Sequence, residues 1–168
     1  YGYDNLPKVE RQVTPTGYFA KLHTQARQMT VRIETGSSNG SGVIIAKEGD
    51  SYYVLTAKHV VTNLNTQRQF TDAQIITYDQ DRHRTTSTVV AEGVDLAVIK
   101  FSSNSNYPLA QLGEYSPKSL DLVFVGGFPG REKINSPLWQ WQLNPGFMTE
   151  KETGKLLIQN NQSFSNGY

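Results

Sequence analysis

Cysteine is absent from the 168-residue chain, which excludes disulfide bonds, thiol catalysis and cysteine-based metal sites. Excess charge is also nearly absent, because 16 lysine and arginine residues stand against 15 aspartate and glutamate residues and give a net charge of +1. A chain without a large basic field is poorly suited to binding nucleic acid through its phosphates. The sequence therefore predicts no nucleic-acid partner.

Long hydrophobic runs are missing as well. The longest, such as residues 43–46 and 122–125, are far shorter than the roughly 20 residues that a membrane-spanning helix needs. The first residues, YGYDNLPK, lack the basic start and apolar stretch of a signal peptide, so we expect none in the chain as given. With 37% hydrophobic and 18% charged residues, the composition is typical of a folded globular chain rather than a disordered one.

Short apolar runs separated by turn residues fill most of the chain. After an alternating run at 29–34, candidate strands lie at 43–47, 52–56, 73–78, 86–92 and 96–101, and then at 120–125, 138–143, 146–149 and 155–159. Turn sequences such as Asn144-Pro145-Gly146 separate them. Many short strands without long helical segments predict an all-β barrel or sandwich.

A polar stretch at 102–119, which holds Pro108 and Pro117, divides the strands into two groups. We therefore expect a lead-in segment at 1–28 with a possible short helix at about 18–28. A first β-barrel then occupies 29–107 and a second occupies 108–168.

The strongest chemical signal is His59, which stands where the β-rich run 52–56 gives way to a short turn or helix. A histidine in an apolar stretch is commonly just a packed residue. Asp95 makes that interpretation weaker, because it interrupts the start of another apolar strand and a buried carboxylate is costly unless it is paired. An imidazole N–H is one suitable donor to such a carboxylate.

Four short sequences, in this order, resemble the trypsin-like serine proteases of the bacterial chymotrypsin-fold type, including HtrA-like and cyanobacterial trypsin-like peptidase domains. They are GSGVII at 40–45, TAKHVV at 56–61, DLAVIK at 95–100 and VGGFPG at 125–130. The resemblance covers roughly residue 29 to the C-terminus. It implies an all-β fold of two chymotrypsin-like barrels, with the second barrel incomplete in this chain, and a periplasmic or secreted location by family habit.

The same resemblance implies a serine endopeptidase that acts on polypeptides. In it, His59 is the general base and Asp95 orients the imidazole and stabilises its protonated form. This chemistry needs no metal and no organic cofactor. His23 and His83 have no metal-ligand spacing with His59, so we expect them to be exposed or locally bonded.

The third member of the triad is the departure from the family pattern. The family places its serine in Gly-x-Ser-Gly-Gly, whereas this chain ends at Gly167-Tyr168, so we expect the serine to follow Tyr168. The backbone N–H of Gly167 is then one donor of the oxyanion hole. Tyr168 replaces the acidic residue of trypsin, which argues against trypsin-style activation.

Two other serines lie close to this end of the chain. Ser163 and Ser165 lack the flanking glycines of the motif, so we interpret them as polar loop residues rather than nucleophiles. Ser163 falls near the base of the substrate pocket, where a small neutral floor would favour uncharged side chains at the cleavage site.

Two alternatives remain open. The chain is either part of an active protease, whose C-terminal remainder is a continuation or a separate chain and a partner of this one, or an inactive trypsin-like fold that binds or scaffolds other proteins. An unrelated β-sandwich adhesion domain is a third interpretation if the four sequence matches are coincidental. The glycine-rich segment 36–42 lacks the lysine of a phosphate-binding loop and is expected to be a hairpin.

Overall fold

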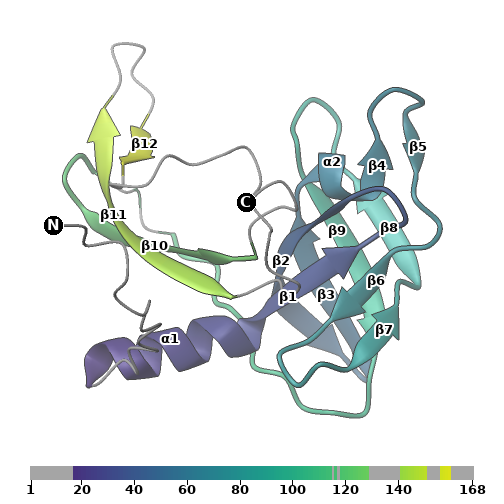
Figure 1. Cartoon of the computed structure of the whole chain (residues 1–168), viewed down its shortest axis with the longest axis horizontal. Helices are drawn as coiled ribbons and strands as arrows, with labels where there is room; N and C mark the ends of the chain where they lie inside the picture. The colour runs from purple at the N-terminus through teal and green to yellow at the C-terminus, as the bar shows by residue number, and fades with distance from the viewer. Residues whose placement is uncertain (1–16, 115, 117, 129–140, 151–155, 160–168) are drawn as a thin grey trace, which may run out of the picture.

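The computed structural model describes residues 17–114, 116, 118–128, 141–150 and 156–159 (Figure 1). Within these residues, the helices are α1 (Tyr18–Met29) and α2 (Lys58–Val61). The strands are β1 (Thr30–Glu34), β2 (Asn39–Glu48), β3 (Ser51–Thr56), β4 (Thr62–Asn63), β5 (Arg68–Gln69), β6 (Gln74–Ile76), β7 (Arg82–Arg84), β8 (Ser87–Val90), β9 (Ala97–Ser102), β10 (Leu122–Gly127), β11 (Gln142–Glu150) and β12 (Leu156–Gln159). The predicted all-β class is confirmed, and none of the described helices is long and apolar enough to cross a membrane.

The larger sheet curls into a barrel. Its strand order is β7-β6-β1-β2-β3-β9-β8, with all pairs antiparallel. The two outer strands, β7 and β8, belong to one stretch of chain that leaves β6 and joins β9. Between them, the N–H of Thr85 donates to Ala73 O at 3.2 Å and the N–H of Thr86 donates to Lys100 O at 2.7 Å. The segment 82–90 therefore links the two ends of the sheet, because it bonds to β6 at its start and to β9 at its end.

Alternating side chains fill this barrel. In β3, Tyr52, Val54 and Thr56 point inward and are buried, and the residues between them are half-buried. The alternation predicted for β1 is present too, since Val31 and Ile33 are fully buried. The whole core cluster consists of Val31, Ile33, Ile44, Tyr52, Val54, Val60, Val61, Ile75, Ala97, Ile99, Phe101 and Tyr107. Burial of these apolar groups is the main force that stabilises the barrel.

The second sheet has the strand order β10-β11-β12. The turn predicted at residues 144–146 is wrong, because β11 runs through it without a break and Pro145 lies opposite Phe124 of β10. β12 pairs with β11 only over residues 147–150. Among the described strands, Pro145 thus has a neighbour on one side only, and a strand with a free side tolerates the missing N–H of proline.

Residues 82–84 form strand β7, although two of the three are charged arginines. The reason is His83, which pairs with Ile75 of β6 and places its ring 4.7 Å from that of Phe101. Its Nε2 lies 3.1 Å from Thr77 Oγ1 and 3.3 Å from the hydroxyl of Tyr107. Burial lowers the pKa of His83 and outweighs the carboxylates of Asp79 and Asp81, which raise it. His83 is thus a bonded, half-buried residue of the first barrel.

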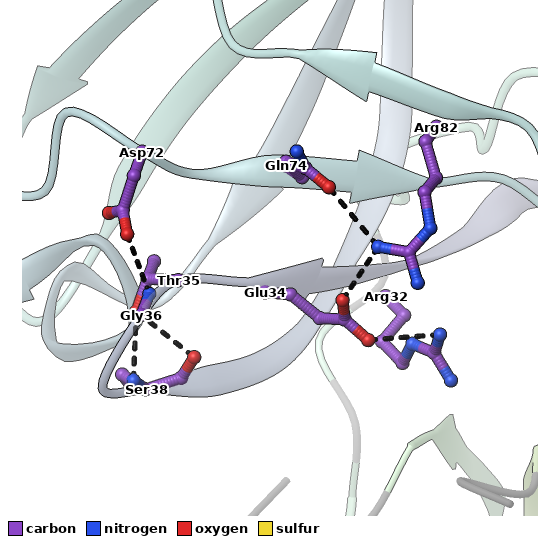
Figure 2. Close-up of polar contacts among 8 residues, drawn as sticks. All are labelled: Arg32, Glu34, Thr35, Gly36, Ser38, Asp72, Gln74 and Arg82. Carbon is purple, nitrogen blue, oxygen red and sulfur yellow. Dashed lines mark hydrogen bonds and ion pairs between the residues drawn. The ribbon is translucent and has the colours of Figure 1, made fainter.

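Polar contacts fix the hairpin between β1 and β2, as Figure 2 shows. Asp72 Oδ2 accepts the N–H of Gly36 at 2.8 Å, and Thr35 Oγ1 accepts the N–H of Ser38 at 2.8 Å. On β1, Glu34 bridges two arginines, at 3.0 Å from Arg32 and 2.9 Å from Arg82. The glycine-rich segment 36–42 therefore begins as a turn held by hydrogen bonds, and β2 starts directly after this turn at Asn39.

Gly42 of β2 has no room for a side chain. An added Cβ would lie 2.5 Å from Val54 Cγ1 and 3.1 Å from the carbonyl oxygen of Leu55, which is held in the β2–β3 ladder. Overpacking of a core typically costs about 1–3 kcal/mol, and we expect Gly42→Ala to lower the free energy of unfolding by about 3 kcal/mol. Denaturant unfolding followed by circular dichroism measures this change.

Gly36→Ala is the matched control. Its added Cβ would approach only the carboxylate end of Asp72, at 2.8 Å, and that exposed side chain can rotate away. We expect a change of no more than about 1 kcal/mol, the cost of losing the exposed hydrogen bond between Gly36 and Asp72. Equal unfolding midpoints for the two alanine variants would contradict the predicted crowding at Gly42.

Candidate active site

His59 lies where strand β3 passes into the short helix α2. β3 ends at Thr56, and the N–H of Val60 donates to Ala57 O at 3.1 Å, which closes the first turn of α2. Val60 and Val61 are buried and anchor this turn in the barrel. The His59 side chain is left 40% exposed, so its ring is accessible from solvent.

Asp95 reaches His59 because of the pairing between β3 and β9. The last residue of β3, Thr56, lies opposite the first residue of β9, Ala97. In an antiparallel pair, the chain that leaves one strand lies beside the chain that enters the other. The segment just before β9 is therefore next to the segment just after β3, at the end of the barrel where Figure 1 shows α2.

Both carboxylate oxygens of Asp95 are bonded to His59. Oδ2 lies 2.6 Å from Nδ1 of the ring, and Oδ1 accepts the backbone N–H of His59 at 2.9 Å. The hydrogen bond from His59 holds the pKa of Asp95 below its usual value, although partial burial acts in the opposite direction. Asp95 is thus an ionised acceptor, which fixes the proton on Nδ1 and the lone pair of neutral His59 on Nε2.

A hollow of about 420 Å³ lies beside this pair. Its walls are formed by Lys58, His59, Leu64, Gln67, Gly93, Val94 and Asp95. Leu64 and Val94, which are 57% and 54% exposed, form the apolar part of a wall that also carries polar and charged side chains. The arrangement offers a proton acceptor at the edge of an open space that can hold a side chain.

Sequence reasoning missed the apolar walls of this hollow. Their signal was present, because Leu64 stands between two asparagines and Val94 stands between Gly93 and Asp95. A large apolar side chain within a polar turn is either exposed or covered by another molecule.

The first three of the four sequence matches gather at this site. The segment 40–45 lies in β2, 56–61 carries His59, and 95–100 begins with Asp95 and continues into β9. A Cβ added at Gly40 would lie 2.6 Å from Val60 Cγ2, which explains a glycine where β2 passes the turn that carries His59. The fourth match lies in and after β10, and only its part up to Phe128 belongs to the described residues.

The remaining predicted site residues, Gly167 and Ser163, lie outside the described residues, as do Ser165 and Tyr168. No group of three or more potential metal ligands gathers in the part of the chain that the structure describes.

Comparison with known proteins gives one family match and several similar structures. The family model of the trypsin-like peptidase domain matches residues 40–167. A search of curated proteins finds no match. Among solved structures, the serine endoprotease from Yersinia pestis is similar, with a TM-score of 0.61 and 23% identity. The match covers 84% of this chain and 48% of the Yersinia pestis chain.

A second similar structure is the mutant, inactive form of Rv3671c from M. tuberculosis H37Rv, with a TM-score of 0.58 and 18% identity. The match covers 76% of this chain and 53% of that one. The chain thus spans about half the length of these two structures. At such identities the likeness concerns the fold.

Proposed function

Because the chain belongs to the trypsin-like peptidase domain family, we propose that it supplies the acid–base half of a serine endopeptidase that cleaves polypeptides. The predicted chymotrypsin-like fold class is confirmed by the similar structures. The observation that carries the proposal is the bond of 2.6 Å between His59 Nδ1 and Asp95 Oδ2, together with the second bond from the backbone N–H. These contacts support a base held in one tautomer and one orientation.

In the proposed reaction, Nε2 of His59 takes the proton of a serine hydroxyl as that oxygen attacks the peptide carbonyl. The resulting imidazolium gives the proton to the leaving amine, and Asp95 stabilises the positive charge while it exists. Water then repeats the sequence on the acyl-enzyme, with His59 again as base. The chemistry requires no metal or organic cofactor.

The nucleophile is proposed to be the residue that follows Tyr168. Gly167 and Tyr168 match the first two positions of Gly-x-Ser-Gly-Gly, which supports a serine at the next position. The N–H groups of Gly167 and of that serine would then form the oxyanion hole. Ser163 would lie near the floor of the substrate pocket, and the part of the protein after Tyr168 would complete the second barrel.

A serine-directed phosphonate tests this assignment on the protein that continues beyond Tyr168. Peptide mapping by mass spectrometry is expected to find the label on the serine immediately after Tyr168. A Ser165→Ala variant is expected to label at the wild-type rate. Label on Ser163 or Ser165 would contradict the assignment of the nucleophile, and a folded protein without any label would support an inactive binding or scaffolding module instead.

A further inference from the structure

One hydroxyl of the first barrel is hydrogen-bonded to both backbone groups of the residue that follows β10 of the second sheet. Ser41 belongs to β2, and Phe128 directly follows β10. Ser41 Oγ accepts the N–H of Phe128 at 2.7 Å and lies 3.3 Å from its carbonyl oxygen, to which it donates. Because Ser41 Oγ accepts from the N–H and donates to the carbonyl oxygen of the same residue, the two bonds fix both the distance and the orientation of Phe128 relative to β2.

The backbone of Ser41 is bonded in turn to the segment that carries His59. The carbonyl oxygen of Ser41 accepts a hydrogen bond of 2.8 Å from the hydroxyl of Thr56, at the end of β3. On either side of Ser41, Gly40 packs against Val60 and Gly42 pairs with Thr56. Ser41 therefore moves as one piece with the turn on which His59 lies.

Phe128 is held just as firmly on its own side. Its ring lies 5.7 Å from that of Trp141 in an edge-to-face contact, and the indole N–H of Trp141 donates to His23 Nε2 at 3.1 Å. His23 belongs to α1, which also places Phe19 5.6 Å from Phe124 of β10. Figure 1 shows α1 beside this sheet, leading directly into β1 of the first barrel.

We propose that Ser41 is a positioning residue that fixes the second sheet, through Phe128, at the distance from His59 that the reaction needs. The inference rests on the proposed function, in which the base lies on the first barrel and the nucleophile on the second. Proton transfer requires the two groups within hydrogen-bond reach, and a misplacement of about 1 Å costs about 10²-fold in rate. A single half-buried hydroxyl between the sheets is therefore enough to affect turnover.

The fluorescence of Trp141 measures the contact between Ser41 and Phe128 without the need for catalytic activity, because the Trp141 ring packs against that of Phe128. In a Trp139→Phe background, Trp141 is the remaining tryptophan, since the chain has two. Ser41→Ala is expected to shift its emission maximum and to raise its quenching by acrylamide, because Phe128 is released from the first barrel. Ser87→Ala removes an exposed serine of the same barrel and is expected to change neither. Unchanged emission and quenching in folded Ser41→Ala would overturn the inference.

Kinetics on the protein that continues beyond Tyr168 test the positioning role. Ser41→Ala is expected to lower kcat about 10–100-fold, as for a misplacement of about 1 Å, with KM changed less than about threefold. The pH dependence of kcat/KM should stay the same, because the His59–Asp95 bonds remain. Ser41→Thr keeps the hydroxyl and is expected to restore most of kcat.

The two experiments separate the possible failures. A fluorescence change without a fall in kcat would overturn the positioning role. A wild-type protein without activity would overturn the proposed function and the kinetic role that depends on it, whereas the fluorescence of Trp141 would still decide whether Ser41 joins the two sheets.

Discussion

Replacing His59 by alanine is expected to lower kcat for peptide hydrolysis about 10⁶-fold, the loss typical when a triad histidine is removed. The serine hydroxyl is a weak nucleophile at neutral pH and needs a base to take its proton. Among the described groups, Nε2 of His59 is the base for this step, because Asp95 holds the His59 ring through Nδ1 on the opposite side. Single-turnover hydrolysis of a peptide ester and the rate of phosphonate labelling both measure this loss, in the protein that continues beyond Tyr168.

His83 provides the control histidine for this experiment. It lies in the same barrel, but its Nε2 is bonded to Thr77 and Tyr107 rather than facing the hollow beside Asp95. His83→Gln keeps an acceptor there and is expected to leave kcat within about threefold, with a cost in stability typical of a buried hydrogen bond. Continued labelling of His59→Ala at the wild-type rate would rule out His59 as the base.

The second large effect is expected for Asp95→Asn, which should lower kcat about 10⁴-fold, as the corresponding change does in a protease of this fold. The wild-type carboxylate accepts from Nδ1 and from the backbone N–H of His59 at the same time. An asparagine has only one acceptor oxygen. If that oxygen keeps the backbone bond, its NH₂ group faces Nδ1, which forces the ring proton onto Nε2 and removes the base.

Asp72→Asn is the matched control for this substitution. Asp72 is also an exposed aspartate that accepts a backbone N–H, from Gly36 at 2.8 Å, but no described histidine is bonded to it. Its amide keeps one oxygen for that bond, so we expect kcat within about threefold of wild type, as for a surface substitution. An Asp95→Asn variant that keeps more than a tenth of wild-type kcat would contradict the tautomer argument.

The strands that flank His59 and Asp95 were predicted from the sequence, because each shows a local pattern of apolar residues. The strand that precedes His59 and the strand that follows Asp95 both show clear apolar patterns, and they pair as β3 and β9. The start of β2 was not predicted, because Gly40 and Gly42 look like loop residues. They are strand residues whose missing side chains leave room for Val60 and Val54.

Contacts between segments that are distant in the sequence could not be predicted from local patterns. Trp141 and His23 are 118 residues apart, and nothing in their sequence neighbourhoods predicts the hydrogen bond between them. The hydrogen bond between Ser41 and Phe128 could not be predicted either. Ser41 lies in the glycine-rich segment 36–42, and its partner stands 87 residues further along the chain. The turn expected at Pro145 was wrong for a related reason, since the tolerance of a strand for proline depends on which neighbours it has.

During synthesis, His59 leaves the ribosome 36 residues ahead of Asp95. A nascent chain that has not yet reached β9 therefore holds a histidine without its acceptor, and the loop between them must close before the two meet. A register error of two residues between β3 and β9 would move Asp95 by about 6.7 Å, beyond hydrogen-bond reach. In the proposed protease, the pairing of His59 with Asp95 therefore depends on correct folding of the first barrel.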